Sequence, residues 1–195
     1  MYSIGLIGLP NSGKSALFNS LTGSRQKVAN FPGITVEKKT GNRRINDKDV
    51  LIVDLPGVYT MDATSQDERV TRDYILNNSD KTSGYILVVD STNLKKSLFL
   101  ALQLKELKVP FVVAMNMFDL SQKRGQELNI EKLSRLLGVS IFKTVAVKGE
   151  GIEQLDTVVT TFLEEGETHE KIDARYIQEI KKPEYIKTKL DEVDN

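Results

Sequence analysis

The sequence predicts an α/β fold in which a mostly parallel sheet of roughly six or seven strands lies between two layers of helices, followed by a short helical extension. Short apolar runs recur along the chain and have the composition of strands buried on both faces of a parallel sheet. Between them, apolar residues recur at intervals of three and four, which indicates amphipathic helices. A glycine-rich segment joins the first such strand to the first helix.

The composition is that of one domain with a small appendage. The chain has 195 residues, 39% of them hydrophobic, and its composition changes near residue 164, so we expect a main domain over 1–164 and an extension over 165–195. Lys plus Arg and Asp plus Glu are 27 each, so we expect no nucleic-acid partner. Absence of cysteine excludes disulfides and thiolate chemistry. We expect neither a signal peptide nor a membrane span, because no basic region precedes the first apolar run and no run approaches ~20 residues.

The glycine-rich segment follows the apolar run at 2–7 and has the spacing of a P-loop, a glycine, four residues and then Gly-Lys-Ser. Glycines let backbone N–H groups close around a phosphate, and the following helix adds its positive end. Lys14 is expected to reach the outer phosphates and the Ser15 hydroxyl to bind Mg²⁺. The segment therefore predicts a nucleotide site lined by Gly8, Leu9, Pro10, Asn11, Ser12, Gly13, Lys14, Ser15 and Ala16.

Residues 24–37 form a polar stretch without a helical or strand period, and we expect a mobile loop there. In P-loop GTPases a threonine of this loop binds Mg²⁺ and closes over the terminal phosphate. Thr35 is the candidate, although its β-branching also suits the first residue of a strand. Alternating charges from Val36 to Ile45 indicate an exposed edge strand, on which lysines protect against aggregation more readily than they bind RNA. The predicted nucleotide contacts are Gly33, Ile34, Thr35, Val36 and Glu37.

A buried strand at Val50–Val53 ends in a second polar segment, Asp54, Leu55, Pro56 and Gly57. An aspartate at this strand end has the position of the carboxylate that orients Mg²⁺ from its second shell. The Gly57 amide is expected to approach the terminal phosphate. Val58 follows where many GTPases have a glutamine that orients the attacking water, so we expect slow intrinsic hydrolysis. Arg25 and Gln66 lie in nearby loops, where such side chains are usually solvated, and a helix is expected from about Arg69 to Asn77.

The third segment, Asn116, Met117, Phe118 and Asp119, ends a strand at Phe111–Met115. The strand is preceded by another at Tyr85–Asp90 and by a helix at Asn93–Lys105. An Asn-x-x-Asp segment at a strand end is the guanine reader of GTPases. Its carboxylate accepts hydrogen bonds from the N1–H and the exocyclic amine of guanine, a donor pair that adenine lacks. Met117 can cover the base with its thioether.

The remaining elements complete the alternation of strands and helices. We expect a helix at Ile130–Leu137, a strand at Val139–Val145 and a final amphipathic helix at Gly151–Glu164. Backbone amides of Ala146 and Val147 would meet the guanine carbonyl. Two short helices around Pro183 are expected, and His169 is expected to be solvated.

With these residues at the motif positions, residues 1–164 resemble the N-terminal GTPase domains of the FeoB ferrous-iron transporters. The resemblance is carried by Gly8–Ser15, Phe18–Gly23, Gln26–Glu37, Asp54–Tyr59 and Asn116–Asp119. It implies hydrolysis of GTP to GDP and phosphate with Mg²⁺, and activation by K⁺ held by Asn11, where the ion acts as an arginine finger does. A structural hydrogen bond is the alternative role for Asn11.

The resemblance also implies a membrane transport domain in the same protein, a position on the cytoplasmic side of a bacterial inner membrane, and leaves a homo-oligomer open. The family normally adds a helical subdomain that favours the GDP state, whereas roughly 30 residues follow here, so 165–195 have no assigned role. Two alternatives share the same pocket: a ribosome- or RNA-associated, potassium-dependent GTPase, and a nucleotide sensor with negligible turnover. Nothing in the sequence suggests that iron binds here, and Met61, Met115 and Met117 are expected to pack.

Overall fold

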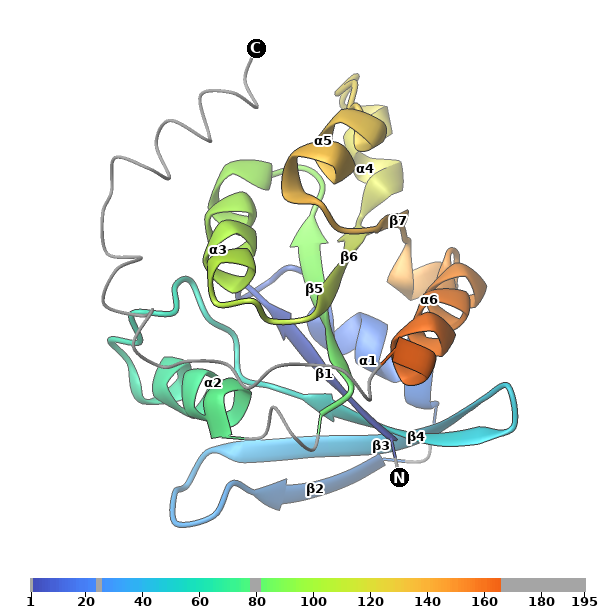
Figure 1. Ribbon diagram of the computed structural model, residues 1–195. Helices are drawn as coiled ribbons and strands as arrows, with labels where there is room; N and C mark the ends of the chain where they lie inside the picture. Colours follow the sequence, from blue (N-terminus) through green and yellow to red (C-terminus); the bar gives the residue numbers. More distant parts are fainter. Residues whose placement is uncertain (1, 24–25, 78–81, 166–195) are drawn as a thin grey trace.

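The computed structural model describes residues 2–23, 26–77 and 82–165, which form a central sheet with helices on both faces (Figure 1). The elements in chain order are β1 (Tyr2–Gly8), α1 (Lys14–Thr22), β2 (Gln26–Asn30), β3 (Glu37–Ile45), β4 (Lys48–Asp54), α2 (Gln66–Asn77), β5 (Gly84–Asp90), α3 (Leu94–Glu106), β6 (Phe111–Asn116), α4 (Phe118–Lys123), α5 (Ile130–Leu137), β7 (Ile141–Lys143), the 3₁₀ turn η1 (Ala146–Lys148) and α6 (Ile152–Glu165).

Within this part of the chain the strand order is β2-β3-β4-β1-β5-β6-β7. The strands from β4 to β7 are parallel neighbours, whereas β2, β3 and β4 pair antiparallel. This confirms the predicted mostly parallel sheet. Because parallel strands end at the same edge, the carboxyl ends of β1, β4 and β6 bring three distant loops to one side of the sheet.

Side chains alternate between the two faces of the sheet, and each face has its own core. Ile4 and Leu6 pack with residues of α1 and α6, whereas Ile7 packs with residues of α2 and α3. Figure 1 shows α1 and α6 beside one another and apart from α2 and α3. Leu17 of α1 and Leu155 of α6 are fully buried, and each such leucine contributes about 2 kcal/mol of hydrophobic stabilisation.

The amino-terminal edge of the sheet corrects two predictions. Part of the expected loop at 24–37 is strand β2, which pairs antiparallel with β3 through Gln26↔Gly41 to Asn30↔Glu37. The strand expected at the edge, β3, therefore lies between β2 and β4. All five residues of β2 are exposed, so their side chains carry no buried alternation. The strand is defined by its backbone hydrogen bonds, and these leave no alternation of apolar and polar residues in the sequence.

Other boundaries differ by a few residues. The helix α5 is confirmed at Ile130–Leu137, the predicted strand at Val139–Val145 is reduced to β7, and the short helix α4 was not predicted. The helix α2 begins three residues before the expected Arg69, because Ser65 and Glu68 form a capping box. The boundary expected at 164–165 falls at the last turn of α6, while Arg25, His169 and the helices expected around Pro183 lie outside the described residues.

Candidate nucleotide site

An ion pair joins the start of α1, which follows β1, to the end of β4. Lys14, at the start of α1, donates from Nζ to the carboxylate of Asp54, at the end of β4. The two side chains are only 11% and 7% exposed. The structure thus brings together the predicted phosphate-binding lysine and the predicted metal-orienting carboxylate.

Glycines allow the phosphate loop, which is the P-loop segment Gly8–Ser15, to fold tightly against the end of β6. Gly13 precedes α1 with a φ of +83°, in the left-handed region, and no side chain caps the helix. A Cβ on Gly13 would lie 2.1 Å from Nδ2 of Asn116, and one on Gly8 would lie 2.7 Å from the carbonyl oxygen of Val88. The first amides of α1 are therefore left for an anion, as in helix N-termini that bind phosphate.

Asn116, which is 2% exposed, links the phosphate loop to the loop after β7. Its Nδ2 donates to the carbonyl oxygen of Ser12 at 3.2 Å. Its Oδ1 accepts from the Ala146 amide at 3.0 Å and from the Thr144 hydroxyl at 3.4 Å. Of the two amides expected to meet guanine, that of Ala146 is thus engaged with Asn116. The role of Thr144 was not predicted, because a lone threonine after a strand carries no signal of its own.

Asp119 lies in the first turn of α4, and its Oδ2 accepts a hydrogen bond from Lys148 Nζ at 3.0 Å. This hydrogen bond holds the pKa of Asp119 below its usual value, against the opposing effect of burial. Met117, just before α4, adopts a left-handed φ of +57°, uncommon for a non-glycine residue. Lys148 was not predicted, because its distance from Asp119 along the chain has no characteristic spacing.

The segment after β4 lies against the phosphate loop. The Val58 amide donates to the carbonyl oxygen of Gly8 at 3.1 Å, and a Cβ on Gly57 would lie 3.1 Å from the backbone nitrogen of Pro10. Val58 is fully buried in the core. Its side chain therefore has neither the chemistry nor the position to orient a water molecule.

Glu68 of α2 organises the loop that follows. It is 5% exposed, and its carboxylate accepts from the Tyr59 and Ser65 amides at 3.0 and 3.2 Å and from the Thr64 amide and hydroxyl at 2.9 and 3.0 Å. Burial raises the pKa of Glu68, but these hydrogen bonds outweigh it and the pKa is lowered overall. The Ser-x-x-Glu spacing in the sequence could have revealed this role.

Thr35 shares no hydrogen bond with the other predicted ligands in the described residues. It is exposed in the hairpin that connects β2 and β3, closed by a hydrogen bond from the Phe31 amide to the Val36 carbonyl oxygen. In the described parts of the chain no hydrogen bond joins its side chain to the phosphate loop. Val36 and Ile34 pack partly against the core, and Glu37 pairs with Lys39.

The donors present fit a magnesium ion. Ser15 is exposed on the first turn of α1, so its hydroxyl is accessible, and the buried Asp54 carboxylate lies beside the neighbouring Lys14. Mg²⁺ prefers such oxygen ligands and keeps several waters. Asn11 is exposed in the phosphate loop with a left-handed φ of +66°. Among the described residues there is no group of three or more His, Cys, Asp or Glu side chains that could hold a metal ion by itself.

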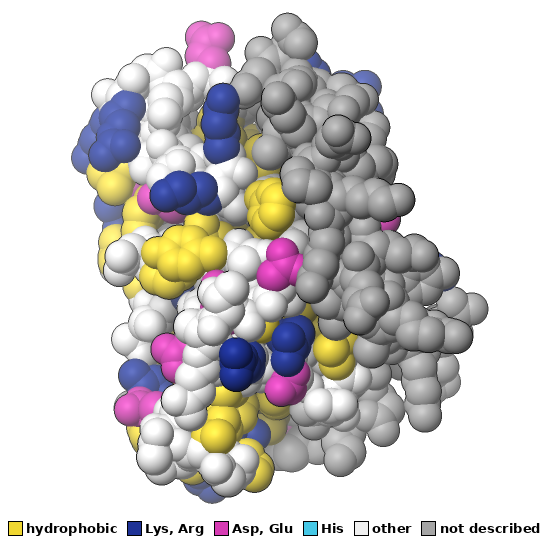
Figure 2. Space-filling model, turned by 90° about the vertical axis from the view of Figure 1, so that its left-hand side faces the viewer, with side chains coloured by type: hydrophobic (Ala, Val, Ile, Leu, Met, Phe, Trp, Pro, Cys, Tyr) yellow, Lys and Arg dark blue, Asp and Glu magenta, His cyan; other side chains and the backbone are white. Residues whose placement is uncertain are grey.

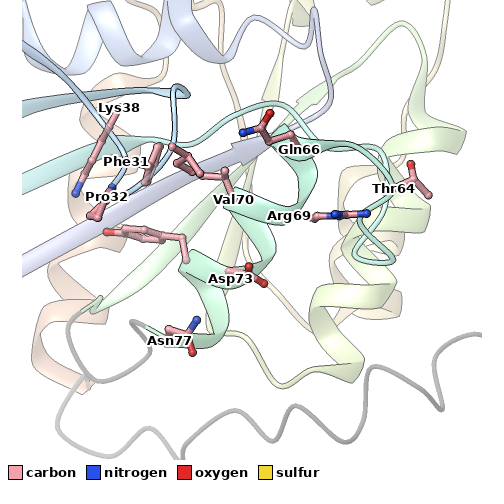
Figure 3. Close-up of a pocket in the computed structure, with 11 residues that line it drawn as sticks. Phe31, Pro32, Lys38, Thr64, Gln66, Arg69, Val70, Asp73 and Asn77 are labelled. Atoms are coloured by element: carbon pink, nitrogen blue, oxygen red, sulfur yellow. The ribbon is translucent and has the colours of Figure 1, made fainter.

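A cavity of about 800 Å³ lies between α2 and the β2–β3 hairpin, and Ile34 is the one predicted nucleotide contact in its lining. Figure 3 shows Phe31, Pro32 and Lys38 on one side of it and residues of α2, including Arg69 and Asp73, on the other. None of its lining residues belongs to the phosphate loop or to 116–119. On the face of the molecule drawn in Figure 2, basic and acidic side chains are interspersed.

No helix in the described ranges is long and apolar enough to cross a bilayer.

Comparison with known proteins gives a consistent family. Residues 2–159 match the family described as Ferrous iron transport protein B. The chain is 45% identical over 164 residues to the Fe(2+) transporter FeoB of Escherichia coli K12, a match that covers 82% of this chain and 21% of that protein. The FeoB of Salmonella typhimurium LT2 is 45% identical over 161 residues, covering 80% and 21%. The chain thus spans about a fifth of the length of these relatives.

Solved structures agree with the sequence matches. The G domain of the T. maritima FeoB iron transporter superposes with a TM-score of 0.77 at 38% identity, over 84% of this chain and 99% of that one. The T. maritima cytosolic domain in its GMPPNP form gives 0.79 at 38% identity, over 87% and 65%. An S. thermophilus NFeoB mutant bound to mGDP gives 0.75 at 44% identity, over 80% and 59%. The chain belongs to the family of FeoB N-terminal G domains.

Proposed function

We propose that this chain binds GTP and GDP with Mg²⁺ and hydrolyses GTP to GDP and phosphate at a slow intrinsic rate. The observation that carries the proposal is the convergence of Lys14, Asn116 and Asp119 at one edge of the sheet through the contacts described above. Relatives have been solved with mGDP and in a GMPPNP form, which supports a guanine nucleotide as the ligand.

Each group of the site has a role in this proposal. The α1 amides and Lys14 bind the phosphates, and Ser15 and Asp54 would hold a Mg²⁺ ion, which would neutralise the phosphate charge. Lys14 must then exchange its bond to Asp54 for one to phosphate. Thr35 would be a further Mg²⁺ ligand once the β2–β3 hairpin rearranges, and the Gly57 amide would contact the terminal phosphate.

The base is recognised at the other end of the site. Asp119 accepts the two guanine donors, Asn116 holds the loops together, and Met117 and Phe118 flank the base. Since the Ala146 amide donates to Asn116, we assign the contact with the guanine carbonyl chiefly to the Val147 amide.

An Asp119→Asn variant tests the guanine assignment. A carboxamide accepts at one oxygen only and presents its own amine to the guanine donors, so GDP affinity should fall by about 100-fold or more. The measurement is the affinity for fluorescent GDP and ADP. The wild-type chain should prefer GDP strongly, and equal binding of the two nucleotides, or an unchanged preference in the variant, would refute the assignment.

Potassium activation is a separate proposal that rests on Asn11 and on the buried Val58. Because Val58 is buried and cannot orient the water, added positive charge at the phosphates is needed, and Asn11, exposed in the P-loop, would hold K⁺ there. Turnover should be faster in KCl than in NaCl at equal ionic strength. Asn11→Ala should abolish this difference while GDP binding persists, and equal wild-type rates in the two salts would exclude activation.

The family further suggests that the nucleotide cycle regulates ferrous-iron transport by a membrane domain of the same protein, with this domain on the cytoplasmic side. Equal numbers of basic and acidic residues give no support to an RNA-bound GTPase. Single-turnover hydrolysis separates a GTPase from a sensor without turnover, because a sensor would leave GTP intact.

A further inference from the structure

The carboxylate that we assign to guanine recognition, Asp119, forms an ion pair with a lysine in this structure. Lys148 Nζ lies 3.0 Å from Asp119 Oδ2, and the two side chains come from η1 and from the first turn of α4. Their hydrogen bond lowers the pKa of Asp119 and raises that of Lys148. Both groups are therefore charged at neutral pH, and the pair is a charge-assisted hydrogen bond.

The turn that carries Lys148 is anchored at both ends. The Lys148 amide donates to the carbonyl oxygen of Val145 at 2.9 Å, and Val145 and Glu150 exchange backbone hydrogen bonds of 3.1 and 3.3 Å. At the start of the turn the Ala146 amide donates to Asn116 Oδ1. The backbone of Lys148 is thus held close to the base-recognition segment, and its side chain needs only to extend to reach Asp119.

We propose that Lys148 competes with the guanine base for Asp119 and thereby speeds nucleotide release. The inference rests on the proposed function. Guanine offers two donors to the two carboxylate oxygens of Asp119, and the Lys148 ammonium already binds Oδ2. An arriving base competes with Lys148 for Oδ2. As the base departs, Lys148 takes over the carboxylate, and this replacement favours release. A group that stabilises the base-free site lowers the nucleotide affinity by the factor by which it stabilises that state.

The expected effect is modest, because water reaches the pair. The Lys148 and Asp119 side chains are 50% and 22% exposed. Ion pairs of this exposure are weak and are screened by salt. Removing the competitor should therefore slow GDP dissociation by about two- to five-fold.

The test compares Lys148→Met with wild type in the 195-residue chain. Methionine keeps an unbranched apolar stem that can cover the base but has no charge. Lys123→Met is the matched control, because Lys123 is an exposed lysine in α4 that acts on Asp119 through charge alone. Dissociation of fluorescent GDP is followed by stopped flow after mixing with excess unlabelled GDP, at low salt and in about 1 M NaCl, where the screening length is about 3 Å.

At low salt Lys148→Met should release GDP about two- to five-fold more slowly than wild type, with Lys123→Met close to wild type. The difference should shrink toward unity at high salt, which a merely structural role of Lys148 would not produce. An unchanged or faster release from Lys148→Met, an equal effect of Lys123→Met, or a salt-independent difference would overturn the inference while leaving GDP binding intact. Failure of the wild-type chain to bind GDP would overturn the inference and the proposed function together.

Discussion

The two ends of the site each hold a lysine against a carboxylate, but in different surroundings. At the phosphate end, Lys14 and Asp54 come from α1 and β4 and are almost completely buried. At the base end, Lys148 and Asp119 come from η1 and α4, and Lys148 is half exposed. The chemistry of the two pairs is the same, so their difference lies in access to water.

This difference separates stability from exchange. A buried charge that loses its partner is costly, so the Lys14–Asp54 pair can open only when phosphate and metal replace what each partner loses. An exposed charge is hydrated as soon as its partner leaves, so the Lys148–Asp119 pair can open and close at little cost. We therefore expect the phosphate end to determine whether the site folds and binds, and the base end to adjust how fast the ligand leaves.

Lys14→Met should have the largest effect. It removes the lysine that we propose binds phosphate and leaves the Asp54 carboxylate buried without its partner, so GDP affinity should fall about 100-fold and the free energy of unfolding by about 3 kcal/mol. Urea denaturation and titration with fluorescent GDP measure the two effects. The double variant Lys14→Met/Asp54→Leu should recover part of the stability but none of the binding, and an unaltered stability in the single variant would contradict the buried-pair argument.

Asn116→Ala should come next, because Asn116 joins the two ends. It leaves the Ser12 carbonyl and the Ala146 amide without their buried partner, and we expect a loss of about 2 kcal/mol in unfolding free energy together with weaker GDP binding. Thr144→Val is the matched control, since it removes only the longer 3.4 Å contact to the same oxygen. Equal losses in the two variants would show that Asn116 does not make this connection.

Glu68→Gln should cost about 1.5 kcal/mol in unfolding free energy, because a neutral amide replaces a carboxylate with four donors. The folded-state pKa of Glu68 lies below its ordinary value of 4.5, so the unfolded chain binds the proton more tightly. Its contribution is present above about pH 4.5 and is lost as the pH falls through the lower folded-state pKa.

The pH dependence is checked by chemical denaturation of wild type and Glu68→Gln over the acidic range. The stability difference between the two should shrink at low pH, and the exposed neighbour variant Asp67→Asn should show no comparable trend. A difference that stays constant down to acid would mean that the carboxylate charge is not what holds the loop.

Lys148→Met should have the smallest effect on stability. Because the pair is hydrated when it opens, we expect no measurable change in Tm, even though GDP release slows. Thermal unfolding followed by circular dichroism checks this. A clear fall in Tm would place the base-end pair among the stabilising contacts and would remove the contrast between the two ends.

Much of the site could be predicted because it depends on local chemistry. Position 13 requires a glycine, since its φ is positive and Asn116 leaves no room for a Cβ. The P-loop spacing in the sequence predicts a glycine at this position. The prediction failed where side chains carry no period, as in the exposed strand β2. Glu68 is a mixed case: its Ser-x-x-Glu spacing could have indicated the capping box with Ser65, whereas the further donors from Tyr59 and Thr64 are visible only in the fold.

The sequence by itself determined the alternation of strands and helices and the three polar segments at strand ends, and it predicted a chemistry toward phosphate, metal and guanine for those segments. Those features follow from hydrophobic periodicity and from residue types at fixed spacing, both of which are local. Only the tertiary structure decided that Lys14 pairs with Asp54, that Asn116 joins Ser12 to Ala146, and that Lys148 reaches Asp119. These contacts join residues that are distant in the chain, and the order and register of the strands bring them together.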